Sequence, residues 1–235
     1  LAFRAAGEGS GLACDRDAHD RDYEHLLLWH ETEQRLLGAY RLGFTTAVVA
    51  RRGLAGLYTH SLFDYSEALL THLGPSLELG RSFVVPDQQR SFAALRLLWR
   101  GIARVLEAHP ELRYLFGPVS ISARYSRTGR ALMELALSRH HADPVLSRLV
   151  RPRTPARPSA GEPLRRSVAA ALADPALLSA VVGRIERGSG LPVLLRHYLE
   201  LRGRFAGFNV DAAFGDTLDG LVFVPVAELP ARWRR

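Results

Sequence analysis

Hydrophobic and polar positions alternate along the first part of the chain in a pattern typical of strands. Apolar runs at 23–29 and 35–42 are separated by the polar segment HETEQ, which predicts a β-hairpin. A further short strand is expected at 54–59, followed by a helix around 63–73. The chain therefore begins with antiparallel strands and continues into a helical segment.

The next segment combines a strand, a loop and a helix. LELGRSFVV at 77–85 is rich in bulky residues and ends at Pro86, which cannot donate a ladder hydrogen bond. After the polar loop PDQQR, apolar residues recur every three or four positions, which predicts a helix with Ser91 as its N-cap. These apolar positions are Leu95, Leu98, Trp99, Ile102, Val105 and Leu106.

The second half of the chain supplies more helices and strands. A buried strand is expected at 113–122 and a helix at 125–140, and the proline-rich segment 151–163 predicts a surface loop. Helical patterns then cover 164–186 and 192–203, and strands cover 205–211 and 219–226. The last 70 or so residues are short for an independent core, so we expect one α/β domain over 1–235, with 164–205 as a helical insertion before the last two strands.

Composition narrows the function classes. The 235-residue chain has a formal charge of +7, and its 31 basic side chains are all arginines. Arginine binds phosphates and carboxylates in a planar fork, so the surface suits an acidic or phosphorylated partner, although biased codon usage explains the same composition. The sequence shows no recognition helix, zinc finger or aromatic RNA-binding strand, so nucleic acid is not an expected partner.

The cysteine, the histidines and the lengths of the apolar runs indicate where in the cell the protein works and whether it binds a metal. The single cysteine, Cys14, excludes an intrachain disulfide framework and favours a reducing compartment such as the bacterial cytoplasm. The nine histidines lack the carboxylate partners and spacing of a metal site, so no metal is expected. No apolar run approaches the ~18 residues of a membrane span. We expect a cytoplasmic protein that touches the inner membrane face at most peripherally.

Glu78 stands in the otherwise apolar strand that ends at Pro86. A carboxylate in such surroundings tends to have a raised pKa, which is useful in a general base, and Gly80 lets a ligand approach the backbone. Strand alternation places Gly80 and Ser82 on the face of Glu78 and Arg81 on the other face. The alternative is a structural ion pair between Glu78 and Arg81 or another arginine.

The loop after this strand and the helix that follows have the features of an anion site. Polar side chains and free backbone amides at a helix N-terminus bind phosphate readily. Arg96, Arg100 and Arg104 recur every four residues on the face opposite the leucines, where like charges repel unless an acidic partner neutralises them. The alternative is a solvated face that Glu107 partly balances.

Several motifs, in the same order, resemble one family. DRDYEHLLLW, GAYRL, ELGRSFV, LLWRGI, LFGPVSIS, GLPVLLRHYLELRGRF and GFNVDAAFGDTLDGL resemble the hemolysin-like N-acyltransferases of ornithine-lipid synthesis, from about residue 14 to 226. These enzymes have the GNAT fold, a central mixed sheet flanked by helices, and ELGRSFV is also similar to ELSR in acyl-homoserine-lactone synthases. The phosphate-loop pattern of that fold falls on Gln88, Ser91 and Ala93, with serine in the first glycine position.

The resemblance implies transfer of a fatty acyl group to the amine of an amino acid such as ornithine or glycine. The donor would be acyl-phosphopantetheine on acyl carrier protein or on coenzyme A, with no tightly bound cofactor. Glu78 would act as the general base, and a backbone amide of its strand would stabilise the oxyanion. Arg81 and Arg41 would position Glu78 or bind the carboxylate of the acceptor.

The remaining roles in this hypothesis concern binding. Gln88, Arg90 and Ser91 would cradle the phosphodiester of phosphopantetheine, and Arg96, Arg100 and Arg104 would dock the acidic carrier protein. Asp20, Glu24 and His25 either line the acceptor pocket or serve as turn and cap residues, and Glu24 replaces the more usual aspartate.

Other interpretations stay open. Asn209, Asp211 and Asp219 flank the last hairpin and are interpreted as turn residues. The arginines between prolines in 151–163 would touch anionic lipid. The competing functions are an acyl-homoserine-lactone type of signal synthase, which would use S-adenosylmethionine, and a module that binds acyl carrier or lipid without turnover.

Overall fold

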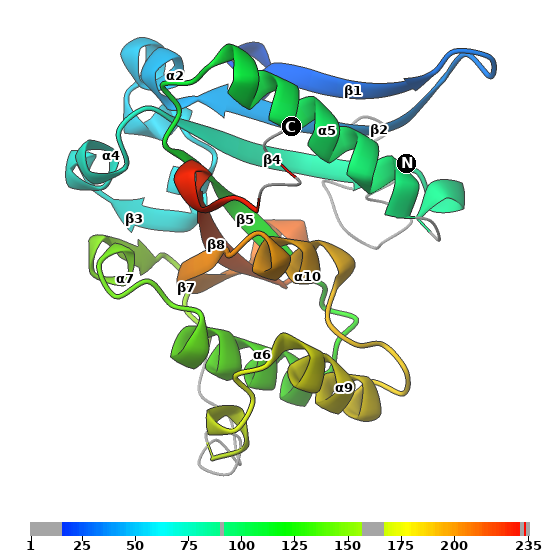
Figure 1. Cartoon of the computed structure of the whole chain (residues 1–235). Coiled ribbons are helices and arrows are strands. Elements are labelled where there is room, and N and C mark those ends of the chain that lie inside the picture. The colour runs from blue at the N-terminus through cyan, green and yellow to red at the C-terminus, as the bar shows by residue number, and fades with distance from the viewer. Residues whose placement is uncertain (1–15, 90–91, 157–166, 231–232, 234–235) are drawn as a thin grey trace.

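The computed structural model describes residues 16–89, 92–156, 167–230 and 233. Its centre is a six-stranded mixed sheet with the order β1-β2-β4-β5-β8-β7, in which β4 and β5 pair parallel and the other neighbours pair antiparallel (Figure 1). In spatial order its strands are β1 (Glu24–His30), β2 (Arg35–Phe44), β4 (Ser76–Val84), β5 (Tyr114–Ile121), β8 (Thr217–Pro225) and β7 (Arg204–Asp211).

Helices cover both faces of this sheet, and each face has its own apolar cluster. The larger cluster packs under α5 (Phe92–Ala108), α6 (Arg127–His140), α9 (Pro175–Ile185) and α10 (Val193–Glu200). The smaller cluster packs under α2 (Thr45–Arg52), α3 (Thr59–Leu62), α4 (Glu67–Leu73), α7 (Leu146–Leu149) and the small sheet of β3 (Phe63–Tyr65) and β6 (Val150–Pro152). Side chains of alternate strand residues feed the two clusters, Leu77 and Leu79 the larger and Phe116 the smaller.

Short 3-10 turns join these elements. They are η1 (Ala18–Arg21), η2 (Leu54–Gly56), η3 (Pro86–Gln88), η4 (Ala212–Phe214) and η5 (Val226–Glu228). The turn η1 precedes β1, η2 joins α2 to α3, and η4 joins β7 to β8, and residues in or beside these turns contribute to the functional site. They therefore belong to the site as well as to the fold.

Most predicted elements are confirmed. The first hairpin, the strand that ends before Pro86, the strand at 113–122 and the last two strands are all present. The helix after the polar loop buries Leu98, Trp99 and Ile102, as the spacing predicts. The N-cap assigned to Ser91 lies outside the described residues.

One predicted strand is wrong, and one predicted helical segment is interrupted. The strand expected at 54–59 is instead the turn η2 and the start of α3. Gly53 has a φ of 65°, which turns the chain sharply at this point. Within the pattern 164–186, residues 167–170 and α9 are helical, with a break at 171–174. At the start of α9, Asp174 accepts a hydrogen bond from the backbone N–H of Ala176 and caps the helix.

Gly117 allows the central strands to approach each other closely. A Cβ at this position would overlap the carbonyl oxygen of Leu79 on β4. We expect Gly117→Ala to lower the free energy of unfolding by about 2–3 kcal/mol, because backbone atoms cannot yield as a flexible side chain can. Urea unfolding of the wild type and the variant measures this difference in free energy.

The matched control is Gly80→Ala on the facing strand. Its Cβ would meet Arg41 at 3.9 Å, which is an ordinary contact. Equal unfolding midpoints for the two variants would contradict the close approach at Gly117.

Candidate active site

The sheet opens at its centre, where β4 and β5 diverge. These strands pair only over Ser76–Glu78 and Tyr114–Phe116, whereas β5 pairs with β8 along its whole length. Pro118 follows Gly117 in β5 and has no N–H to donate, so the ladder cannot continue through it. Local sequence on β5 therefore contributes to the opening.

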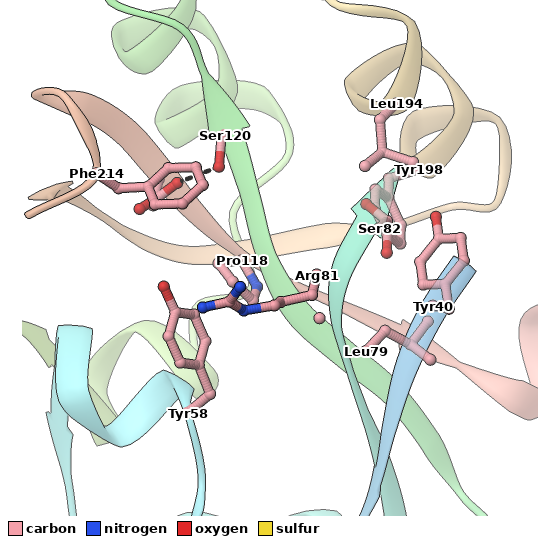
Figure 2. A pocket seen from close by; sticks show the side chains of 12 residues that line it. Tyr40, Tyr58, Leu79, Arg81, Ser82, Pro118, Ser120, Leu194, Tyr198 and Phe214 are labelled. Carbon is pink, nitrogen blue, oxygen red and sulfur yellow. Dashed lines mark hydrogen bonds between the residues drawn. The ribbon is translucent and has the colours of Figure 1, made fainter. Parts of the chain in front are cut away.

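A pocket of about 210 Å³ fills the opening. Figure 2 shows that it has two ends, one on each side of β5. One end is lined by Tyr40, Ser82, Leu194 and Tyr198, and the other by Tyr58, Arg81, Ser120, Phe214 and Asp219. Gly80 and Pro118 line the passage between the strands. The two ends therefore allow a narrow ligand that enters from one side to contact a second ligand that enters from the other.

A β-bulge shapes the wall of this pocket. The register between β2 and β4 shifts between Ala39 and Arg41, and Arg81 has a φ of 44°, in the left-handed region. The bulge brings the Arg81 side chain to Asp17, on the same face as Glu78, while Ser82 lies beside Tyr40 on the other face (Figure 2). The alternation predicted for Arg81 and Ser82 is therefore wrong, because an extra residue reverses the faces beyond Gly80.

Glu78 is completely enclosed, with 0% of its surface exposed. Its carboxylate accepts hydrogen bonds from the hydroxyl of Tyr23, from the backbone N–H of Tyr58 at 3.1 Å and from that of Thr59 at 2.7 Å. Burial, followed by the Glu78 charge, raises the pKa of Tyr23, so the tyrosine keeps the proton that it donates. Glu78 does not line the pocket but anchors Tyr58, which does.

A charged cluster lies beside Glu78. Arg41 is 1% exposed, and its Nη1 donates to both carboxylate oxygens of Asp17, at 2.7 and 2.8 Å, and to Asp20 at 2.9 Å. Asp17 also pairs with Arg81 at 3.0 Å. The Arg41 guanidinium stacks 5.0 Å from the ring of Tyr23 and 5.2 Å from that of Tyr58. The cluster thus connects the turn η1 to the strands β2 and β4.

Electrostatics within this cluster favour its charged form. Burial alone would raise the pKa of Asp17, but the hydrogen bond and charge of Arg41 and the charge of Arg81 together lower it. Burial would likewise lower the pKa of Arg41, and the hydrogen bonds and charges of Asp17 and Asp20 raise it. The Asp17 carboxylate therefore stays ionised at neutral pH.

We predict a pH signature for Asp17→Asn. Because folding lowers the pKa of Asp17, its stabilising contribution is complete above the unfolded pKa of about 3.9 and is lost as the pH falls through the folded pKa. The difference in unfolding free energy between wild type and variant should be constant near neutral pH and shrink below about pH 4. Urea titrations across this range measure it, and a difference that grows on acidification would contradict the assignment.

Comparison with known proteins decides the family. A family model described as an acetyltransferase (GNAT) domain matches residues 1–100. A glycine N(alpha)-acyltransferase from Bacteroides thetaiotaomicron is 31% identical over 245 residues, which cover 97% of this chain and 72% of the relative. The chain belongs to the GNAT family of N-acyltransferases.

Two further relatives of this GNAT protein agree. A glycine N(alpha)-acyltransferase from Phocaeicola vulgatus is 29% identical over 97% of this chain and 74% of its own length. An L-ornithine N(alpha)-acyltransferase from Agrobacterium fabrum is 32% identical over 107 residues, 43% of this chain and 35% of the relative. No solved structure matches the chain. The predicted family and the mixed sheet flanked by helices are thus confirmed.

The predicted acceptor residues of this GNAT protein separate into two groups. Asp20 belongs to the Arg41 cluster and forms a capping box with Asp17 at the start of η1. Glu24 and His25 are exposed on the edge strand β1, where the His25 ring meets the backbone oxygen of Asp20 at 3.2 Å. The structure therefore brings Asp20, and not the other two, to the centre of the sheet.

The predicted donor-binding residues lie along the loop and helix after β4. Gln88 is half-buried in η3 and donates to Asp87 at 3.3 Å, while Arg90 and Ser91 lie outside the described residues. Along α5, three arginines are exposed, and the last pairs with Glu107 at 2.9 Å. These are Arg96, Arg100 and Arg104. The expected basic face is present, and its partner stays a prediction.

Sequence reasoning missed four residues of this GNAT site. Asp17 lies in the motif DRDAHD, whose acidic spacing of three signals an N-cap, but nothing in it indicates Arg41. Tyr58 lies in the segment 54–59, for which the sequence wrongly predicted a strand. Ser120 lies in no Gly-x-Ser-x-Gly motif of a serine nucleophile, so the sequence assigned it no role. Asp219 was interpreted as a turn residue. The last interpretation is wrong, since Asp219 lies inside β8 with 3% of its surface exposed.

Two features are absent from the described part of the GNAT chain. None of its helices is long and apolar enough to cross a membrane. Within the same residues, no three His, Cys, Asp or Glu side chains gather as ligands of a metal ion would.

Proposed function

We propose that the protein transfers a fatty acyl group from a phosphopantetheine thioester to the amine of an amino acid, producing an N-acyl amino acid. The observation that carries this proposal is the pocket in the opening between β4 and β5, with a hydroxyl-rich end on one side and a charged end on the other. The names of the relatives, which specify glycine and ornithine, support the acceptor class.

The reaction that fits this pocket is direct attack. The acyl-phosphopantetheine arm would enter by the end with Tyr40, Ser82 and Tyr198, and the acceptor would occupy the other end. The amine nitrogen adds to the thioester carbonyl, a C–N bond forms and the C–S bond breaks. An ammonium acceptor first loses one proton to water, and after the addition a second proton passes from the nitrogen to the sulfur.

The backbone at the bulge would stabilise the oxyanion. A bulge residue leaves the ladder locally disrupted, so its peptide groups can face a ligand, and Gly80 has no side chain to obstruct the approach. A preorganised backbone donor aimed at the oxyanion is typically worth about 3 kcal/mol in the transition state. This is the role that the sequence hypothesis gave to an amide of the same strand.

Hydroxyl groups at the donor end would donate hydrogen bonds to the departing sulfur. Burial raises the pKa of Tyr40 to about 12, and burial together with the Tyr40 neighbour raises that of Tyr198 as well. Both hydroxyls therefore keep their protons at neutral pH. Both also line the pocket where the thiolate would form.

Glu78 contributes differently from the direct base of the sequence hypothesis. Its carboxylate has no exposed surface and accepts hydrogen bonds from Tyr23, Tyr58 and Thr59. We assign it a positioning role, in which it fixes the backbone that presents Tyr58 to the pocket. Arg41 and Arg81 support the same region through Asp17.

The carrier would be acyl carrier protein docked on α5. The exposed arginines of this helix face away from the core and offer positive charge to an acidic protein. Replacing Arg96, Arg100 and Arg104 with glutamate should raise the KM for acylated carrier protein at least about tenfold, which is ~1.4 kcal/mol. The KM for acyl-coenzyme A should change less, because its 3′-phospho-ADP group is far smaller than a carrier protein and does not span the helix face.

The control replaces Arg139, Arg148 and Arg151, exposed residues on α6, α7 and β6, with glutamate. It changes the net charge by the same amount on another part of the molecule. An equal rise in the KM for carrier protein in both variants would contradict docking on α5.

The cellular product tests the proposed function. Mass spectrometry of lipids from bacteria that express the chain should show a new N-acyl amino acid, whose mass identifies acceptor and acyl chain together. Cells with an empty vector supply the baseline. Release of methylthioadenosine without an N-acyl amino acid would favour a signal synthase, and neither product would favour a binding module. A cytoplasmic site of action with peripheral membrane contact remains part of the proposal.

A further inference from the structure

The acceptor end of the pocket contains a fixed carboxylate. Asp219 on β8 and Ser120 on β5 are direct cross-strand partners, and the Ser120 hydroxyl donates to Oδ1 of Asp219 at 2.6 Å (Figure 2). Both side chains line the pocket, and Asp219 is 3% exposed. A buried carboxylate in a pocket wall contributes negative charge to the space that it lines. This end of the pocket therefore suits a cationic group.

Positive charge lies across the same end of the pocket. The Arg81 guanidinium extends beside Tyr58 in Figure 2, and both residues line the pocket. Burial, then the charges of Asp211 and Asp219, raise the pKa of Tyr58, while Arg41 and Arg81 act in the opposite direction. The pKa of Tyr58 is thus raised by carboxylates on β7 and β8 and lowered by guanidinium groups on β2 and β4. The pocket end has a negative side and a positive side.

We infer that this end binds the acceptor amino acid as a zwitterion, with its α-ammonium group on Asp219 and its carboxylate directed toward Arg81. The inference rests on the proposed function and adds the orientation of the acceptor. A free amino acid carries these two opposite charges on one carbon, which matches a small pocket with one carboxylate and one guanidinium.

This orientation also explains how the nitrogen reaches the thioester. Asp219 and Gly80 lie in the walls of one pocket, so an amine on Asp219 faces the passage where the acyl carbonyl would lie. A fixed carboxylate holds the ammonium group near the reacting carbon before its proton is lost. Phe214, from η4, stands at the same end and limits the space for the acceptor side chain (Figure 2).

Asp219→Asn tests the inference. Asparagine keeps the size of the side chain and an oxygen for the Ser120 hydroxyl but loses the negative charge. With glycine or ornithine as acceptor, we expect KM to rise at least tenfold while the KM for the acyl donor is unchanged. Activity with methylamine as the acceptor should also fall in this variant, because methylamine has an amine although it has no carboxylate. Arg81→Gln should impair glycine more than methylamine.

The matched control is Asp216→Asn on the same hairpin. Asp216 is exposed and does not line the pocket, and asparagine tolerates its φ of 56°. It loses the same charge and should leave the KM for the amino acid unchanged.

Calorimetric titration of glycine into wild type and Asp219→Asn separates this inference from the proposed function. Weakened glycine binding in the variant supports the acceptor site even if the wild type forms no amide. Unchanged glycine binding and KM in a folded variant, or a wild type that binds no glycine and is saturated by none, would overturn it.

Discussion

Replacing Arg41 with methionine should lower the free energy of unfolding by about 3 kcal/mol. Arg41 is 1% exposed, so its removal would leave Asp17 and Asp20 without their main partner. Breaking a buried ion pair by removing one member costs about 3–5 kcal/mol. We expect the lower end, because the two aspartate side chains are 23% and 24% exposed and water can partly hydrate them.

The matched control is Arg52→Met, which removes an arginine that is 56% exposed and pairs with Asp22 at 3.0 Å. A surface pair of this kind contributes about 0–1 kcal/mol. Guanidinium unfolding of both variants compares the two effects. Adding Asp17→Asn to Arg41→Met should restore part of the loss, because it removes a carboxylate that has lost its main partner. Equal losses for Arg41 and Arg52 would contradict the central position of the cluster.

Glu78→Gln should reduce turnover about 100-fold. The glutamine amide would present N–H groups to the donors of Tyr23, Tyr58 or Thr59, which loosens the segment that carries Tyr58 into the pocket. A misplacement of about 1 Å can cost ~100-fold in rate. An unsatisfied buried donor should also lower the unfolding free energy by about 1–3 kcal/mol.

The pH dependence separates positioning from proton transfer. If Glu78 positions Tyr58, the residual activity of Glu78→Gln keeps the shape of the wild-type profile of kcat/KM. If Glu78 is the base, the increase of kcat/KM with pH that reports its ionisation is absent from the Glu78→Gln profile. Tyr23→Phe serves as a milder control, since it removes one hydrogen bond and keeps the carboxylate. Nearly full activity in a stable Glu78→Gln protein would exclude both roles.

Local patterns in the sequence predicted most of the fold. The apolar alternation of β4 and the three-and-four spacing of α5 both report burial on one side of an element, which depends on residues close together in the chain. The strand pattern led to Glu78, and the family resemblance led to roles for Arg41, Arg81 and Asp20. Arg41 and Arg81 both pair with Asp17. Asp20 pairs with Arg41 and accepts a hydrogen bond from the backbone N–H of Asp17.

The rest of the site depends on contacts between distant residues. Asp17 and Arg41 are 24 positions apart, and Ser120 and Asp219 are 99 apart, so no local period links them. The bulge at Arg81 depends on pairing between β2 and β4, and it reverses the faces of Arg81 and Ser82. Asp219 looked like a turn residue because an acidic residue beside glycine is common in turns.

The most direct test of the central claim uses purified protein with an acylated carrier protein and glycine or ornithine. The account predicts that one N-acyl amino acid forms for each free carrier thiol released, with both measured by mass spectrometry and thiol titration. Thiol release without amide, or no turnover with any amino acid and either acyl carrier protein or coenzyme A as carrier, would contradict it.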